Sequence, residues 1–138
     1  MGFPFEFIVR GPPRSAKTRN RPALRQWKNA VADAALLRFP ADAALVTEKL
    51  RMVVSYYHDG ADAGLDLDNM LKPIRDALNG VVYEDDSQIV VSAFGATPID
   101  GRYRVKGIST VLAEGFRDGL EFLHVVIEPA PDDGELLK

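Results

Sequence analysis

A group of aspartates on both sides of a short helical segment constrains this chain more than any other feature. Residues 66–89 read DLDNMLKPIRDALNGVVYEDDSQI, so Asp66 and Asp68 precede the helical segment and an acidic run, Glu84 to Asp86, follows it. Carboxylates repel one another, so a group that converges on one point requires a cation. Ligands that offer only oxygen suit a hard ion such as Mg²⁺. The sequence therefore predicts that the fold brings these acids together around a metal ion.

The polar residues at the start of this helix can be explained by a role in catalysis or by a role in helix capping. Asp66 and Asp68 share a face if the chain is extended there, because side chains at i and i+2 point the same way. Asp68 or Asn69 would alternatively cap free N–H groups of the helix. Pro73 removes a hydrogen bond if it lies past the first turn, which favours a helix that starts near residues 69–71. Capping of this helix does not explain Asp66.

Two further choices stay open on spacing alone. Lys72 lies one helical turn after Asp68, where it would either stabilise charge on a phosphate beside the metal or pair with Asp76. The acidic run ends at the mouth of an apolar strand, so one of its members can meet the first two aspartates. Spacing does not distinguish Asp85 from Asp86 for that position.

The hydrophobic patterns predict alternating strands and helices. Strands are expected over residues 3–9, 45–57, 88–94 and 119–128, and a weaker one over 102–112. Ile89, Val91 and Ala93 are expected on one side of the third strand. The first helix is expected over residues 22–37, with Pro22 in its first turn, and the second is expected to stop at Asn79-Gly80. The buried stripe of the first helix is expected to comprise Leu24, Trp27, Val31, Ala34 or Ala35, and Leu36.

Composition limits the class of protein. A chain of 138 residues is long enough for one domain with a real core. It contains no cysteine, which excludes disulfides and thiolate-bound zinc and fits a cytoplasmic location. No apolar run approaches the roughly 20 residues that a membrane span needs. We expect the domain over residues 1–128, followed by a disordered acidic tail over 129–138.

Positive charge is concentrated in one segment of an acidic protein. The net charge is −3, yet seven of the 17 Lys and Arg residues lie between residues 10 and 28, where there is no acid. Such a segment can bind phosphate while the molecule stays acidic, or it can be an ordinary solvated loop and helix face. The candidate DNA-binding residues are Arg14, Lys17, Arg19, Arg21, Arg25 and Lys28.

Three linked motifs resemble the RusA family of Holliday junction resolvases, which are small dimeric endonucleases that cut crossover junctions. The first is D-x-D-N-x-x-K at residues 66–72, the second is D-A-L-N-G at 76–80, and the third is D-D-x-Q-[IV] at 85–89. Pro12-Pro13 after the first strand is also similar to the opening of the family. The resemblance covers roughly the first two thirds of the chain.

The resemblance implies a role for each matched residue. Asp66, Asp68 and Asp86 match the metal-binding catalytic aspartates, and Lys72 matches the essential lysine. Asn69 and Asp85 match supporting positions. The family fold implies an α+β domain, with a mixed sheet of about four strands packed against two main helices.

The implied activity is Mg²⁺-dependent resolution of four-way junctions by paired symmetric cuts, with Mn²⁺ as a substitute ion. A homodimer is implied, because a two-fold dimer presents two identical sites. The chain departs from the family in its acidity and in residues 59–65, DGADAGL, which lack the basic and aromatic residues that some members insert into the junction. Two alternatives therefore remain, a binding module for branched DNA with little or no catalysis, and a nuclease acting on flaps or forks.

Overall fold

A four-stranded sheet and three helices form the computed structural model, which describes residues 2–59, 67–99 and 108–131. In chain order the elements are β1 (Phe5–Arg10), α1 (Arg21–Leu36), β2 (Leu50–His58), α2 (Leu67–Ala77), the 3₁₀ turn η1 (Asp86–Gln88), β3 (Ile89–Pro98), α3 (Thr110–Phe116) and β4 (Phe122–Pro129). This is the expected α+β fold of one compact domain. The disordered tail expected over residues 129–138 is wrong at its start, because β4 includes Pro129 and the backbone N–H of Ala130 donates to the carbonyl of Lys49 at 3.0 Å. Residues 132–138 lie outside the described part of the chain.

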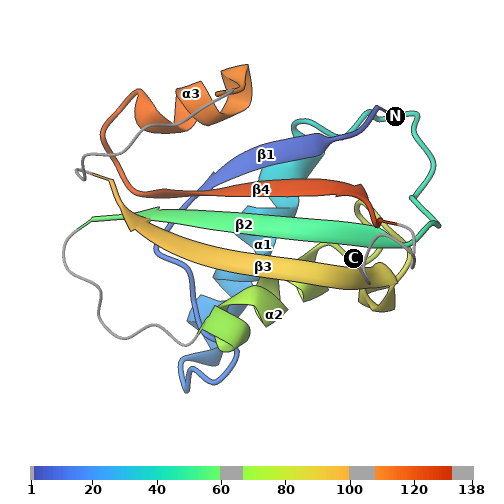
Figure 1. The fold of residues 1–138 in the computed structure, drawn as a ribbon. Coiled ribbons are helices and arrows are strands. Elements are labelled where there is room, and N and C mark those ends of the chain that lie inside the picture. Colours follow the sequence, from blue (N-terminus) through green and yellow to red (C-terminus); the bar gives the residue numbers. More distant parts are fainter. Residues whose placement is uncertain (1, 60–66, 100–107, 132–138) are drawn as a thin grey trace.

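The last strand lies inside the sheet. The strand order is β1-β4-β2-β3, with β4 antiparallel to both β1 and β2, and β2 parallel to β3. The sheet is therefore mixed, as expected, and β1 and β3 form its edges. Figure 1 shows α1 and α2 together on one face, with α2 beside the edge strand β3, and α3 apart from them near β1.

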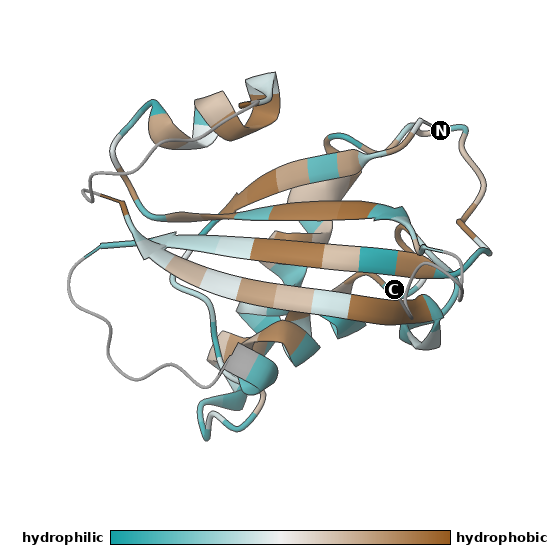
Figure 2. Ribbon diagram, in the orientation of Figure 1, coloured by the Kyte–Doolittle hydropathy of each residue, from teal (hydrophilic) through white to brown (hydrophobic). Residues whose placement is uncertain are grey.

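Alternation along the strands builds the core between the sheet and the two longer helices. Every second residue of β1 and β2 is buried, and Figure 2 shows hydrophobic residues along all four strands. Trp27 of α1 is 4% exposed, which confirms that it packs in the core. No helix in the described ranges is both long and apolar enough to cross a membrane.

The first helix follows its predicted signals closely. Its N-cap is Asn20, whose side chain accepts a hydrogen bond from the backbone N–H of Ala23 at 3.1 Å. Pro22 lies in the first turn, where its missing N–H costs nothing. The predicted stripe is correct except at Leu36, which is 55% exposed because the helix ends there.

A bulge changes the expected faces of β3. Leu50 pairs with Ile89 while Arg51 pairs with Val91, so Val90 is an extra residue in the register. Ile89 therefore faces the core, whereas Val91 lies on the opposite face, and the predicted alternation is wrong. Beyond the bulge, Ser92 lies on the same face of the sheet as α2.

Residues 102–112 were expected to form a weaker strand. The described part of this segment, residues 108–112, is not a strand. Residues 110–112 begin α3, which Ser109 caps by accepting a hydrogen bond from the backbone N–H of Leu112 at 3.1 Å. Residues 102–107 lie outside the described ranges. The N-cap serine favours a helix over the strand suggested by the apolar residues.

Helix α3 packs on the other face of the sheet through a glycine. A Cβ atom on Gly115 would lie 2.2 Å from the ring of Phe122, which is fully buried. Phe116 completes the contact edge-on, with its ring centroid 5.1 Å from that of Phe122. Only a residue without a side chain lets the helix approach this closely.

We predict that Gly115→Ala destabilises the protein by about 1–3 kcal/mol, because the added methyl overpacks the Phe122 contact. Alanine has the higher helix propensity, which makes the sign of the effect informative. Urea denaturation measures it. Gly95→Ala is the matched control, since no heavy atom lies within 4 Å of a Cβ at that position. Equal stability of the two variants would contradict the prediction.

Candidate active site

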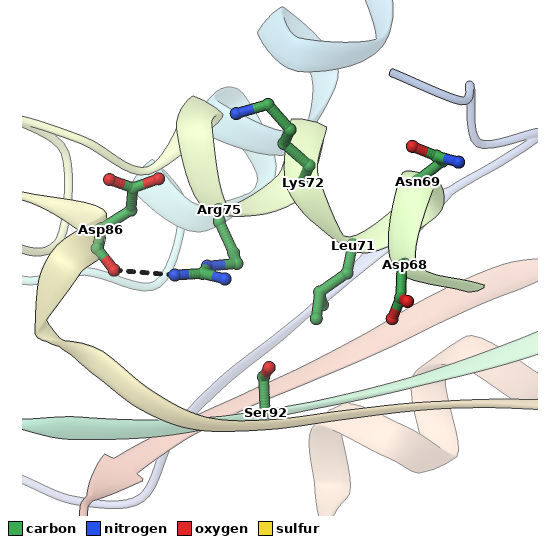
Figure 3. Close-up of a pocket in the computed structure, with 7 residues that line it drawn as sticks. All are labelled: Asp68, Asn69, Leu71, Lys72, Arg75, Asp86 and Ser92. Carbon is green, nitrogen blue, oxygen red and sulfur yellow. Dashed lines mark hydrogen bonds between the residues drawn. The ribbon is translucent and has the colours of Figure 1, made fainter. Parts of the chain in front are cut away.

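An open pocket lies between α2, η1 and the edge strand β3. It has a volume of about 490 Å³. Figure 3 shows the lining residues, which are Asp68, Asn69, Leu71, Lys72, Arg75, Asp86 and Ser92. Four of the residues singled out from the sequence thus line one pocket: Asp68, Asn69, Lys72 and Asp86.

The first turn of α2 carries Asp68 to the pocket. The helix begins at Leu67, before the start that Pro73 predicts. Asp68 is therefore helical, and the expectation that it shares a face with Asp66 in an extended segment does not apply. Asn69 lies inside the first turn, so it is not the N-cap residue, the structural alternative that the sequence left open for it. The spacing of four residues puts Asp68 and Lys72 on the same side of the helix. Asp66 lies outside the described residues, and its place in the site stays a prediction.

Pro73 leaves one carbonyl of α2 without its helical partner. Proline lacks an N–H, so residue 73 cannot donate to the carbonyl of Asn69, four residues earlier. The backbone N–H of Ala16 donates to that carbonyl instead, at 2.8 Å. This bond joins the basic loop between β1 and α1 to the start of α2, and Figure 1 shows the two side by side. Pro73 is therefore compatible with the early helix start.

Lys72 keeps the freedom to move toward a ligand in the pocket. Its side chain is 67% exposed, and its Nζ lies 3.7 Å from Oδ2 of Asp76. The same carboxylate pairs with Nζ of Lys28 on α1 at 3.8 Å. Such exposed pairs contribute only about 0.3–0.5 kcal/mol. The pair anticipated from the sequence is present, but it is too weak to hold Lys72 away from the pocket.

The two neighbouring aspartates have different surroundings. Asp85 caps η1, where its carboxylate accepts a hydrogen bond from the backbone N–H of Ser87 at 3.0 Å. Hydrogen bonds from the side chain and then the backbone of Ser87 lower the pKa of the Asp85 carboxyl. Asp86 lines the pocket and Asp85 does not. The geometry thus separates two residues that spacing alone left equivalent.

Gln88 fixes η1 to the rest of the fold. Its side-chain oxygen accepts a hydrogen bond from the backbone N–H of Asp85 at 2.9 Å, which completes a capping box. Its amide nitrogen donates to the backbone carbonyls of Val46 and Glu48, both at 2.9 Å. These bonds hold Asp86 at the pocket through the backbone of η1.

Tyr83 supports α2 next to the pocket. Its side chain is fully buried, and its hydroxyl donates to the backbone carbonyl of Arg75 at 2.6 Å. Burial raises the pKa of this phenol, and the negative charge of Asp86 raises it further. Tyr83 therefore stays neutral and donates this bond throughout the physiological pH range.

The pocket offers oxygen donors for a metal ion from two elements. Asp68 and Asp86 present the carboxylates that a hard cation prefers. Figure 3 shows them at opposite ends of the pocket, where they do not point at each other. Among residues 2–59, 67–99 and 108–131, no three His, Cys, Asp or Glu side chains are grouped closely enough to hold a metal. The donor chemistry suits Mg²⁺, and Asp66 is the remaining expected ligand.

The basic residues expected to bind DNA divide into two groups. The first group has exposed side chains without an ion pair or hydrogen bond in the part of the chain described, and consists of Arg14, Lys17, Arg19 and Arg25. In the second group, Arg21 donates to the backbone carbonyls of Ala16 at 3.1 Å and Thr18 at 3.3 Å, and Lys28 pairs with Asp76. The first group is available to phosphate, whereas the second also shapes the loop and the contact between α1 and α2.

The sequence patterns do not single out three of the lining residues. Arg75 carries a signal, because it follows Lys72 by three residues and therefore lies on a neighbouring part of the helix surface. Leu71 has the pattern of a core residue and is 8% exposed. Ser92 carries no signal, because only the bulge at Val90 turns it toward α2.

We predict that Gln88→Leu lowers the free energy of unfolding by about 1–3 kcal/mol, because the carbonyls of Val46 and Glu48 and the N–H of Asp85 each lose a hydrogen bond. Urea denaturation measures the change. Glu84→Gln is the control just before this turn, since the side chain of Glu84 is exposed. A Gln88→Leu variant as stable as this control would show that the three bonds do not stabilise η1.

Comparison with known families agrees with the resemblance seen in the sequence. The family model described as endodeoxyribonuclease RusA matches residues 8–106, a range that includes every residue lining the pocket. No individual curated protein matches the chain in a sequence comparison. Because the match spans well over half of its length, the chain belongs to the RusA family of endodeoxyribonucleases.

Proposed function

We propose that this protein is a Mg²⁺-dependent, structure-specific endodeoxyribonuclease that resolves four-way DNA junctions during recombination and repair. One observation carries the proposal: Asp68, Lys72 and Asp86 line one pocket, and the loop that carries free basic residues is bonded to the same helix. Membership of the RusA family supports nuclease activity on branched DNA.

The pocket residues suit hydrolysis of a phosphodiester bond. Asp66, Asp68 and Asp86 would hold Mg²⁺, and Mn²⁺ would be accepted in its place. The bound ion supplies Lewis-acid activation of water and of the leaving oxygen. Lys72, whose side chain is 67% exposed, would approach the phosphate and stabilise the negative charge that develops on it. Asp85 supports this site by capping η1, and Asn69 by accepting the bond from the basic loop.

The basic segment would position the DNA. Arg14, Lys17, Arg19 and Arg25 would contact phosphates, while Arg21 and Lys28 contribute to the same positive surface. Phosphate contacts release counterions, so binding is expected to weaken steeply with salt. The net charge of −3 does not oppose this, because the acids lie outside the segment.

A homodimer is part of the proposal. Resolution of a four-way junction requires two symmetric cuts, and a two-fold dimer presents two identical sites to a substrate of similar symmetry. The cysteine-free composition and the DNA substrate favour action in the cytoplasm.

A second candidate is a nuclease for flaps or forks. It is favoured by residues 59–65, which lack the basic and aromatic side chains that would enter a junction centre. Comparing cleavage of a four-way junction, a fork, a flap and a linear duplex separates the two activities. Tight junction binding without cleavage in Mg²⁺ or Mn²⁺ would instead indicate a binding module.

We predict that Asp68→Asn lowers junction cleavage by at least about 100-fold in Mg²⁺, because it removes a charged metal ligand. Paired nicks in a synthetic four-way junction provide the measurement, with EDTA as a second control. Asp42→Asn, an exposed aspartate in a loop, is the matched variant and should cleave normally. Cleavage by a folded Asp68→Asn protein at the wild-type rate would refute the mechanism.

We also predict that Arg25→Gln reduces the slope of log Kobs against log[salt] by about 0.9, since one phosphate contact is lost. Junction binding is measured in EDTA over a range of salt concentrations. Arg51→Gln is the control, because Arg51 lies on the opposite face of the sheet, where it pairs with Glu128. If both variants show the same slope as the wild-type protein, Arg25 does not contact phosphate.

A further inference from the structure

Arg75 is a cation in the pocket without an acidic partner among the residues that the structure describes. Its Nη2 donates to the backbone carbonyl of Asp86 at 3.0 Å. Its Nε is buried and has no hydrogen-bond partner in the described part of the chain. It forms no ion pair with any acid in residues 2–59, 67–99 or 108–131, although two aspartates line the same pocket.

This arrangement leaves the guanidinium in need of an anion. A guanidinium carries five N–H donors and a permanent charge, and one carbonyl satisfies only part of that capacity. Partly buried charges are normally paired, because removal from water is costly without a counter-charge. The planar fork of donors matches a phosphate group.

The surroundings of Arg75 hold it at the centre of the pocket. Figure 3 shows its side chain between Asp68 and Asp86, with its guanidinium on the side of the pocket that Ser92 faces. Tyr83 fixes the backbone of Arg75 by donating to its carbonyl at 2.6 Å. Lys72 lies three residues earlier on α2 and lines the same pocket, so two cations are placed beside two carboxylates.

We propose that Arg75 binds the phosphate of the DNA strand that is cut, as a second cationic contact beside Lys72. The inference rests on the proposed nuclease function and adds a residue to its site. Lys72 supplies a mobile point charge, whereas Arg75 supplies an oriented fork that fixes the phosphate relative to Asp86. Arg75 thus contacts substrate directly, rather than acting only through the carbonyl of Asp86.

The test measures DNA binding without metal and cleavage with metal. Wild-type protein, Arg75→Gln, Arg75→Lys and the charge control Arg51→Gln are titrated with a four-way junction in EDTA across salt concentrations. Junction cleavage is then measured against substrate and Mg²⁺ concentration. Asp68→Asn serves as the inactive reference, and thermal unfolding checks that each variant folds.

If Arg75 binds the phosphate, Arg75→Gln should reduce the slope of log Kobs against log[salt] by about 0.9 and kcat/KM by about 100-fold. The Mg²⁺ concentration for half-maximal activity should stay unchanged. Arg75→Lys should recover the slope and only part of the rate, because it keeps the charge and loses the fork.

An Arg75→Gln protein with the wild-type salt slope would overturn the inference, even if it cleaved poorly, because Arg75 would then act only on Asp86. If wild-type protein does not cleave, the proposed function fails while the slope still tests Arg75. Should Arg75→Gln fail to fold, the Arg75 Nε–H signal in NMR spectra of wild-type protein replaces it. A shift of that signal on adding junction in EDTA supports the contact, and an unchanged signal overturns it.

Discussion

The hydrogen bond from the Ala16 N–H to the Asn69 carbonyl is the constraint on which the site depends. It exists because Pro73 cannot donate to that carbonyl, so a strand-to-helix loop from the N-terminal part of the chain binds there at 2.8 Å. A residue usually regarded as a helix breaker thereby creates a docking point for a second segment. The bond places a basic loop next to the helix turn that carries Asp68, which neither segment could achieve alone.

Much of the fold follows from patterns that act over a few residues. The alternation of Phe5, Phe7 and Val9 and the proline at position 22 gave the first strand and helix correctly, because local propensity and burial agree there. The parallel pairing of β2 with β3 and the central place of β4 depend on contacts between distant residues, such as Phe5 with Ile127. No local pattern encodes such pairing. The same holds for Ser92, whose direction is set by one extra residue in a neighbouring register.

The sequence predicts the site residues whose chemistry and motif agree. It does not predict the roles that depend on which groups a side chain contacts in the fold. Asp68, Lys72 and Asp86 were identified from residue type and spacing, and they line one pocket. Only the structure distinguishes the capping role of Asp85 from the pocket position of Asp86, because the roles depend on which carboxylate faces the Ser87 N–H. The proline predicts a later helix start than the observed one, because the local pattern does not reveal the loop whose N–H replaces the lost hydrogen bond. The sequence does not reveal the role of Arg75, because that role depends on a buried Nε without a partner and on the lack of an acidic neighbour among the described residues.

The central position of β4 has a consequence for the protein as it is synthesised. Both β1 and β2 hydrogen-bond to β4 rather than to each other, so residues 5–10 have no strand partner until residues 122–129 have left the ribosome. The segments that carry the pocket residues emerge much earlier, but the sheet that supports them remains divided until then. A sheet closed by such distant pairing forms late and slowly. A nascent chain would thus carry its acids and lysine before the sheet behind them is complete.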